Sequence, residues 1–283
     1  MNHLHPDHLH DIKKSGLSDE IILKADISSV TPDMINKRLG FNIPGIISAY
    51  QIPYGNGYYR FKIFYDETQR HYTDGKEKPK YLTRKNDGNK LYIPAKVKPI
   101  LNDSSIPLYI TEGEKKALKA TQEGLICIAM PGLWNWKIKN EKKLIPCFDL
   151  LELDGRTIHL VPDSDWQQTD RKGEPNNQKQ AIYELAYLLI ERGAKVYWVE
   201  LPVGDIKVGI DDFLCSHTVE DFKKLQLREI HMQSIEEEIC SISPDEAGRY
   251  EILRITKRIA EVKNETEREI YTQRLSKKIS VSK

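Results

Sequence analysis

The sequence predicts an α/β protein built on a mainly parallel sheet with helices on its faces. Between residues 100 and 228, short apolar segments alternate with amphipathic segments that have a helical period. Strands connected through helices form right-handed crossovers, which make them parallel neighbours in one sheet. A basic, aromatic-rich stretch precedes this region, and a charged stretch of helical period follows it. We therefore expect a mixed α+β subdomain before the sheet domain and a helical tail after it.

The elements of the central region follow from these patterns. We expect strands at 108–111, 125–130, 157–161 and 196–199, and helices at 114–123 and 178–192. The apolar stripe of the second helix consists of Ala181, Leu185, Leu188 and Leu189. Gly124 and Gly193 follow the two helices, at positions where glycine commonly ends a helix.

The flanking regions differ from the centre in composition. Residues 58–65 alternate aromatic or aliphatic with basic side chains, which predicts a strand with one buried face. Between Arg60 and Lys98 there are eleven Lys or Arg and five Asp or Glu. This excess favours an anion-binding surface, although a simple solvated face also explains it. Apolar stripes after residue 228 predict helices, so the expected divisions are 1–99, 100–228 and 229–283.

Composition excludes several classes of protein. The chain of 283 residues is 39% hydrophobic and 30% charged, with a net charge of +1, as in ordinary globular proteins. No apolar run reaches the ~20 residues that span a bilayer, so we expect no membrane partner. The four cysteines include no C-x-x-C pair, which argues against a zinc ribbon and is typical of reduced thiols in a cytoplasmic protein. We expect His3, His5, His8 and His10 to form a mobile lead-in to a helix after Ser18.

Acidic residues follow three of the predicted strands. Glu112 follows the first strand, Asp163 and Asp165 follow the third, and Asp211 and Asp212 come after the fourth. The carboxyl ends of parallel strands meet at one edge of a sheet, where active sites form. Carboxylates gathered there repel one another unless a cation lies among them, and their hard oxygens suit Mg²⁺ or Mn²⁺. The alternative is structural, with the acids acting as helix caps and turn formers.

This pattern resembles the Toprim domain of bacterial primases, topoisomerases and some nucleases. In that family a glutamate–glycine pair follows the first strand and an Asp-x-Asp follows the third, matched here by Glu112-Gly113 and Asp163-Ser164-Asp165. The resemblance extends toward DnaG-type primases over about residues 58–283. It rests on Tyr59-Arg60-Phe61-Lys62-Ile63, Pro79-Lys80-Tyr81-Leu82, Leu91-Tyr92 and Glu267-Arg268-Glu269-Ile270-Tyr271.

A group of Toprim-like domains in replication proteins of plasmids, phages and integrated elements is more similar still. These domains accompany helicase modules. The matching segments are Glu112-Gly113-Glu114-Lys115-Lys116 and Gly209-Ile210-Asp211-Asp212-Phe213-Leu214. The sequence also departs from the primase pattern, because Lys116 replaces an aspartate and no zinc-ribbon cysteines precede the core.

The resemblance implies a primase-like nucleotidyltransferase that makes short primers on single-stranded DNA during replication of a mobile element. Its partners would be the DNA template, nucleoside triphosphates and a replicative helicase. Glu112, Asp163 and Asp165 would be catalytic and would hold Mg²⁺ or Mn²⁺, with Asp211 and Asp212 completing the metal cluster.

The basic residues have two interpretations. Those expected to contact template or nucleotide phosphates are Arg60, Lys62, Lys80, Arg84, Lys115 and Lys116, while Tyr81 would stack on a base. For Lys115 and Lys116 the alternative is an ordinary salt bridge. Two other functions stay open: a Toprim nuclease that uses the same acids, and a catalytically degenerate module that binds nucleic acid or a helicase.

Overall fold

The computed structural model describes residues 4–139, 141, 143–167, 178–204, 206–230, 235–242 and 249–280. Contacts divide the chain into two units. The first comprises Met1–Asp165 and Ala181–Ile230, and the second Trp166–Gln180 and His231–Lys283. No helix among the described residues is both long enough and apolar enough to cross a membrane.

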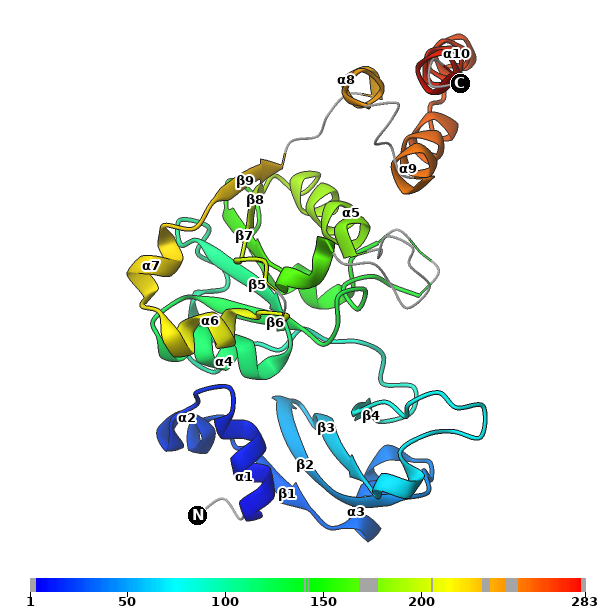
Figure 1. Ribbon diagram of the computed structural model, residues 1–283. Helices are drawn as coiled ribbons and strands as arrows, with labels where there is room; N and C mark the ends of the chain where they lie inside the picture. The colour runs from blue at the N-terminus through cyan, green and yellow to red at the C-terminus, as the bar shows by residue number, and fades with distance from the viewer. Residues whose placement is uncertain are drawn as a thin grey trace. The chain divides into compact units, whose positions relative to one another are not determined.

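An antiparallel sheet of four strands organises the start of the first unit (Figure 1). Its strands run in the order β1 (Ser28–Val30), β2 (Ile46–Gly55), β3 (Tyr58–Tyr65) and β4 (Tyr81–Thr83). The helices of this part are α1 (Pro6–Lys13), α2 (Asp19–Lys24) and α3 (Pro32–Leu39). The predicted strand at 58–65 is therefore confirmed as β3.

The two faces of this sheet pack against different helices, because successive strand residues point to opposite sides. Phe61 and Ile63 of β3 pack with Leu39 of α3 in one apolar cluster. Tyr50 and Ile52 of β2 belong instead to the cluster that contains Ile12 of α1. Basic residues of β3 alternate with Phe61 and Ile63, so Arg60 and Lys62 share the face opposite α3.

A sheet of five strands forms the rest of the first unit, in the order β6-β5-β7-β8-β9. The strands are β5 (Leu108–Glu112), β6 (Cys127–Met130), β7 (Thr157–Val161), β8 (Lys195–Val199) and β9 (Leu227–Ile230). Strands β5 to β8 pair in parallel, which confirms the predicted α/β class. The edge strand β9 is antiparallel to β8 and was not expected from the sequence.

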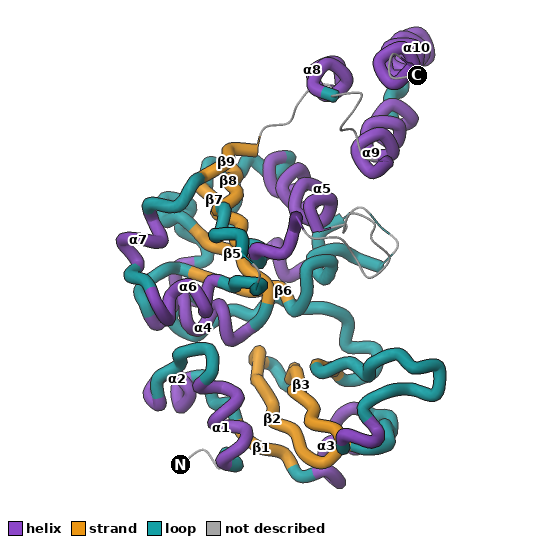
Figure 2. Tube along the Cα trace, viewed as in Figure 1, coloured by secondary structure: helices purple, strands orange, loops and turns teal. Residues whose placement is uncertain are grey.

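Helices cover both faces of the five-stranded sheet (Figure 2). They are α4 (Glu114–Gln122), α5 (Gln178–Ile190), α6 (Ile210–Ser216) and α7 (Val219–Lys223). Helix α4 packs on α6 and on strands β5 and β6. On the other face, Tyr183 of α5 packs edge-on against the Trp198 ring of β8. The predicted helices at 114–123 and 178–192 are thus confirmed with slightly shorter bounds.

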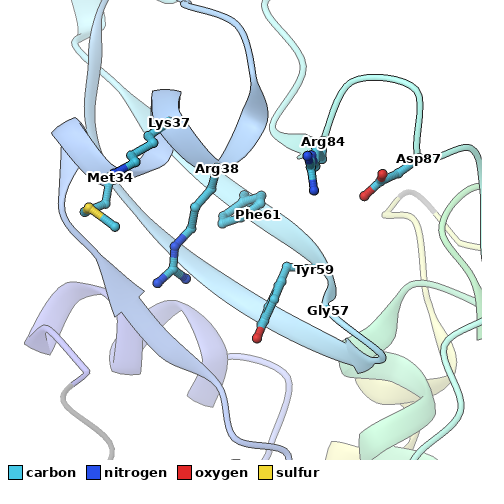
Figure 3. Close-up of a pocket in the computed structure, with 8 residues that line it drawn as sticks. All are labelled: Met34, Lys37, Arg38, Gly57, Tyr59, Phe61, Arg84 and Asp87. Carbon is cyan, nitrogen blue, oxygen red and sulfur yellow. The ribbon is translucent and has the colours of Figure 1, made fainter.

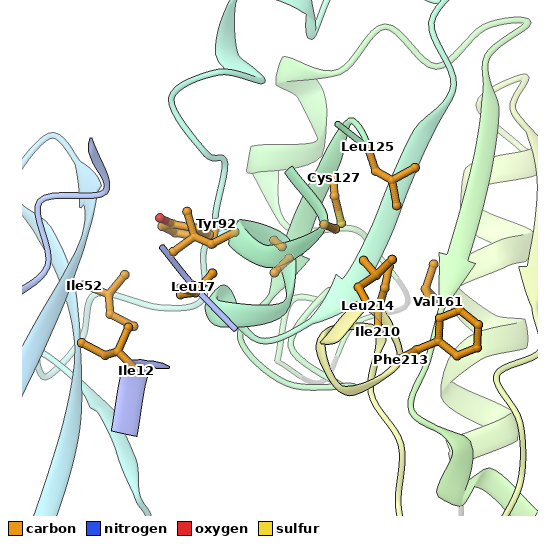
Figure 4. Packing of buried hydrophobic residues seen from close by; sticks show 14 of the residues in the cluster. Ile12, Leu17, Ile52, Tyr92, Leu125, Cys127, Val161, Ile210, Phe213 and Leu214 are labelled. Atoms are coloured by element: carbon orange, nitrogen blue, oxygen red, sulfur yellow. The ribbon is translucent and has the colours of Figure 1, made fainter. Parts of the chain in front are cut away.

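One apolar cluster joins the two sheet regions of the first unit (Figure 4). Ile12 and Leu17 from the amino-terminal end and Ile52 from β2 pack in the same cluster as Ile210 and Phe213 of α6. Burying this apolar surface stabilises the association of the two regions, at roughly 25 cal/mol per Å² removed from water.

The amino-terminal histidines are the main local correction. Three of them, His5, His8 and His10, are described, and the last two lie within α1. His8 is 1% exposed, its Nδ1 lies 2.7 Å from the Ser29 hydroxyl, and its Nε2 lies 2.9 Å from the Ser48 hydroxyl. This segment is a packed helix rather than the expected mobile lead-in, because it covers the lower face of the first sheet. His3 lies outside the described residues.

The second unit contains a helical tail, as predicted. Its helices are α8 (Ile235–Ser241), α9 (Arg249–Ala260) and α10 (Glu265–Ser280). Ile255, Ile259 and Leu275 from the predicted stripes are buried in one cluster. The carboxylate of Glu238 is fully buried and forms ion pairs with Arg254 and Arg258. These contacts link α8 to α9 by charge as well as by apolar packing.

Candidate active site at the carboxyl edge of the five-stranded sheet

The predicted acids follow their strands as the sequence pattern requires. Glu112 is the last residue of β5, and Asp163 comes two residues after β7. Gly113 adopts φ +94° between β5 and α4, a conformation that residues with a side chain rarely adopt. Its amide donates to the Met130 carbonyl at 2.9 Å, which fixes the turn beside Glu112.

Ser164 brings a distant loop to this edge. Its amide donates to the Val208 carbonyl at 2.9 Å, and its hydroxyl accepts from the Val208 amide at 2.8 Å. The two bonds hold residues 206–209 beside the end of β7. Consequently Lys207 and Gly209 lie next to Asp163.

Two lysines neutralise the aspartates of the Asp-x-Asp motif. Asp163 is 3% exposed, and its two oxygens are paired separately, Oδ1 with Lys116 and Oδ2 with Lys207 at 2.7 Å. Lys207 also lies 3.2 Å from Asp165. Burial opposes the charge of Lys207, but the charges of Asp163 and Asp165 outweigh it and raise the pKa of this ammonium group. The aspartates therefore face fixed positive charge.

Gly209 is where a second pair of groups approaches Asp163. A β-carbon at this position would lie 2.6 Å from Lys116 Cε, 2.7 Å from Asp211 Oδ1 and 3.2 Å from Asp163 Oδ1. Only glycine leaves room for these three side chains to converge. Asp211 is 6% exposed, and its Oδ1 is buried with no hydrogen-bond partner in the described part of the chain. Burial raises the pKa of this carboxyl, against the hydrogen bond from Ser15 and the charge of Lys116.

Glu112 carries uncompensated negative charge at the same edge. Burial raises the pKa of its carboxyl, and the charge of Asp163 raises it further. The charges of Lys116 and Lys207 act in the opposite direction but do not cancel the rise. Asp212, by contrast, points at its own helix, where its Oδ2 accepts from the Gly209 amide at 2.8 Å. Asp212 thus caps α6, and its other predicted role in the cluster stays a prediction.

The three residues after Gly113 each fasten a different part of the first unit. Glu114, 2% exposed, accepts from Arg60 at 2.8 Å and from the Tyr54 hydroxyl at 2.6 Å, which ties α4 to the four-stranded sheet. Lys115 lies 3.3 Å from Asp11 of α1. Lys116 pairs with Asp163, so both lysines form the salt bridges that were the alternative to phosphate contacts.

The basic residues of the amino-terminal sheet divide between its two faces. The Tyr81 ring centroid lies 4.7 Å from the Arg60 guanidinium and 4.6 Å from the Lys62 ammonium. Burial lowers the pKa of Lys62, although the charge of Asp11 partly opposes this. Lys80 is half-exposed and lies 3.7 Å from Glu77. The remaining candidate, Arg84, is exposed and lies with helix α3.

The donors at the carboxylate edge suit one hard cation in chemistry but not in present arrangement. Glu112, Asp163, Asp165 and Asp211 offer carboxylate oxygens, and the buried Asp211 Oδ1 lacks a partner. Among the described residues, however, no three potential ligands are grouped closely enough to hold a metal ion. Lys116 and Lys207 lie where a cation would otherwise neutralise Asp163. A Mg²⁺ or Mn²⁺ ion here would have to replace Lys207, whose side chain is 48% exposed.

Sequence reasoning did not identify every residue of this edge. Lys207 was assigned no role, because its contact with Asp163 depends on the course of a loop 44 residues further along the chain. Tyr54 and Asp11 were missed for the same reason, since their partners Glu114 and Lys115 lie far away in sequence. The available signal was the surplus of acids at the strand ends, which requires nearby positive charge.

Comparisons with known proteins agree with this architecture. Residues 98–221 match the model of a domain of unknown function, DUF3854, which covers less than half of the chain. No curated protein matches the sequence.

Solved primase structures match almost the whole chain. The Aquifex aeolicus primase (zinc-binding and RNA polymerase domains) superposes with a TM-score of 0.54 and 14% identity, over 98% of this chain and 68% of that one. A DNA primase domain from Pseudomonas aeruginosa gives 0.53 and 16%, over 97% and 89%. The RNA polymerase domain of Mycobacterium tuberculosis primase DnaG gives 0.54 and 11%, over 95% and 90%. At these identities the likeness concerns the fold, and the chain has the fold of a DnaG-type primase catalytic core.

Proposed function

We propose that this chain is a primase-like nucleotidyltransferase, of the Toprim type, that makes short primers on single-stranded DNA. One observation carries the proposal. Acids from separate segments, Glu112, Asp163, Asp165 and Asp211, converge at the carboxyl edge of a parallel sheet in a primase fold. Active sites of such sheets form at this edge. Replication of a mobile element, with a helicase as partner, is the setting that the sequence resemblance favours.

The reaction would be an in-line displacement. A primer 3′-hydroxyl attacks the α-phosphorus of a nucleoside triphosphate, a P–O bond forms, and the bond to pyrophosphate breaks. A divalent cation bound by Glu112, Asp163 and Asp165 would supply charge neutralisation on the phosphates. The chain's own contribution is positive charge already in place. Lys116 and Lys207 can transfer their hydrogen bonds from Asp163 to incoming phosphate oxygens, because both ammonium groups border the same edge.

The amino-terminal sheet would hold the template beside that edge. Lys62 and Lys80 extend the basic surface, and the ion pair of Arg60 with Glu114 connects this sheet to α4. Phosphate contacts of this kind position a strand without reading its sequence. Tyr81 already contacts two cations, so base stacking on its ring would require these cations to share the surface with the base.

A second function is favoured by one observation. The ion pair of Lys116 with Asp163 occupies a carboxylate oxygen that a metal would use, at the position where the primase motif has an aspartate. A protein with this substitution could bind DNA or a helicase through the primase fold without synthesis.

Product analysis separates these functions. The purified chain is incubated with end-labelled single-stranded DNA, all four nucleoside triphosphates and either Mg²⁺ or Mn²⁺. New oligonucleotides that contain incorporated nucleotide support the primase, whereas shortened template indicates a nuclease. Intact template that stays bound, without new product under either metal, overturns synthesis and leaves the binding module.

A further inference from the structure

A second basic and aromatic hollow lies on the face of the four-stranded sheet that α3 covers. Its volume is about 440 Å³. Its main lining residues are Met34, Lys37 and Arg38 from α3, Tyr59 and Phe61 from β3, and Arg84 after β4 (Figure 3). Because Arg60 and Lys62 point to the opposite face of β3, this hollow is separate from the basic surface beside the carboxylate edge.

Positive charge dominates the hollow and is largely uncommitted. Lys37 and Arg84 are exposed and have no side-chain partner among the residues that the structure describes. Arg38 donates to the Gln51 side chain, a neutral acceptor that leaves its charge uncompensated. Asp87 is the one acid among the described lining residues. Three cations against one carboxylate give a local surplus of two positive charges.

Aromatic surface lies between these cations. Figure 3 shows Tyr59 and Phe61 between Arg38 on one side and Arg84 on the other. Phe61 is 1% exposed and forms part of the floor, while the half-buried Tyr59 ring is accessible. The Arg38 guanidinium lies 5.9 Å from the Tyr59 ring centroid. A planar group placed on Tyr59 would therefore also contact a guanidinium plane.

We propose that this hollow binds a nucleotide, with the base on Tyr59 and Arg38 and the phosphates on Lys37 and Arg84. Exposed aromatic rings bordered by cations are the combination that holds single-stranded nucleic acid, since every base has a flat face and every nucleotide a phosphate. The nucleotide can belong to a single strand or be free, and the two sources share this chemistry. The inference concerns binding alone and does not require the synthesis proposed above.

The test measures binding without catalysis, in a buffer that contains EDTA and no metal. The full chain is titrated into a fluorescein-labelled twelve-residue oligo(dT), into an abasic strand of the same length, and into a labelled ATP analogue. The variants are Lys37→Ala/Arg84→Ala and Tyr59→Leu, which keeps an apolar side chain on the α3 face. The matched control is Lys139→Ala/Lys195→Ala, which removes two exposed lysines elsewhere. Circular dichroism confirms that each variant is folded.

We expect the pocket variants to weaken oligo(dT) binding at least about fivefold and the control pair to leave it nearly unchanged. The slope of log K against log salt should become shallower by about 1.4 in the double variant, at ~0.7 per lost phosphate contact on a single strand. Tyr59→Leu should affect oligo(dT) more than the abasic strand. If only the binding of ATP is weakened, the site still takes a nucleotide but a free one.

Two results would overturn the inference. In the first, the control pair weakens binding as much as the pocket pair, which would mean diffuse attraction to lysines. In the second, all pocket variants bind every probe as the wild type does. Because no turnover is measured, neither result depends on whether the chain synthesises primers.

Discussion

Lys116 and Asp163 form an ion pair across the edge of the five-stranded sheet, between the first turn of α4 and the segment that follows β7. The carboxylate is 3% exposed and the lysine side chain 19% exposed, so solvent screens this pair only weakly. Lys207 approaches the other oxygen of Asp163 at 2.7 Å. A buried carboxylate in a primase fold is thus neutralised by the protein itself.

Replacing Lys116 with the aspartate of the primase motif should strengthen metal binding. Lys116→Asp removes the ammonium from Asp163 and adds a carboxylate beside Glu112, and affinity for hard cations rises with ligand charge. We expect Mn²⁺ to bind roughly tenfold or more tightly by isothermal titration calorimetry, a change of ~1.4 kcal/mol. Lys115→Asp, the same charge change one residue away, is the control. Equal affinities of the two variants would show that Lys116 does not limit the site.

The ion pair between Arg60 and Glu114 should contribute strongly to stability. Their side chains are 12% and 2% exposed, and removing one member leaves the other charged and buried. Arg60→Met should lower the free energy of unfolding by about 3 kcal/mol, as is typical of a broken buried pair. Arg70→Met breaks the half-exposed pair with Glu77 and should cost at most ~1 kcal/mol.

Denaturant unfolding of the full chain measures both changes. The double variant Arg60→Met/Glu114→Gln should recover part of the loss, because no uncompensated charge then remains buried. Similar losses for Arg60→Met and Arg70→Met would contradict a special role of the Glu114 contact.

Nucleotide transfer should depend on pH through Glu112. Burial and the charge of Asp163 raise the pKa of this carboxyl, so its ionised form appears only at a pH above the ordinary glutamate range of ~4.3. Activity that needs the carboxylate should therefore increase as pH rises through the raised pKa. Lys116→Met removes a charge that lowers this pKa, so the acid limb of kcat/KM should move to higher pH. Lys115→Met is the control, and an acid limb that moves to lower pH in Lys116→Met would refute the assignment.

The same shift affects stability. Protonated Glu112 is favoured in the folded state, so its contribution is present at acid pH and is lost as pH rises through the raised pKa. Glu112→Gln should remove this dependence. Thermal unfolding of both proteins across the acid range measures the difference, and parallel curves would show that Glu112 does not titrate in this environment.

The fold was predictable because its signals are local. The apolar segments of β5 and β7 end at Glu112 and shortly before Asp163, and glycines close the helices between strands. Strand β9 was not predictable from Leu227–Ile230 alone, because it is short and partly exposed, and it exists through its pairing with β8. Helix α1 was missed because its stability comes from tertiary contacts of His8 and Ile12 rather than from helix propensity.

The site was predictable in its acids and not in its bases. Spacing along the chain places Asp163 and Asp165 at a strand end, as the Asp-x-Asp pattern indicates. The approach of Lys207 depends instead on Ser164, whose hydrogen bonds to Val208 fix the loop. Likewise, Arg84 was grouped with Arg60 by sequence, but residues before and after β4 alternate between faces, and it lies with Lys37 of α3.

The decisive measurement is incorporation of labelled nucleotide on single-stranded DNA by the wild type, Asp163→Asn and Asp149→Asn, in matched Mg²⁺ and Mn²⁺ buffers. Asp149 is an exposed acid paired with Arg192 and serves as the control for the same chemical change. We predict that Asp163→Asn lowers incorporation by about two orders of magnitude or more, the loss typical when a group that stabilises transition-state charge is removed, and that Asp149→Asn does not. Undiminished incorporation by a folded Asp163→Asn protein would contradict a reaction at this edge of the sheet.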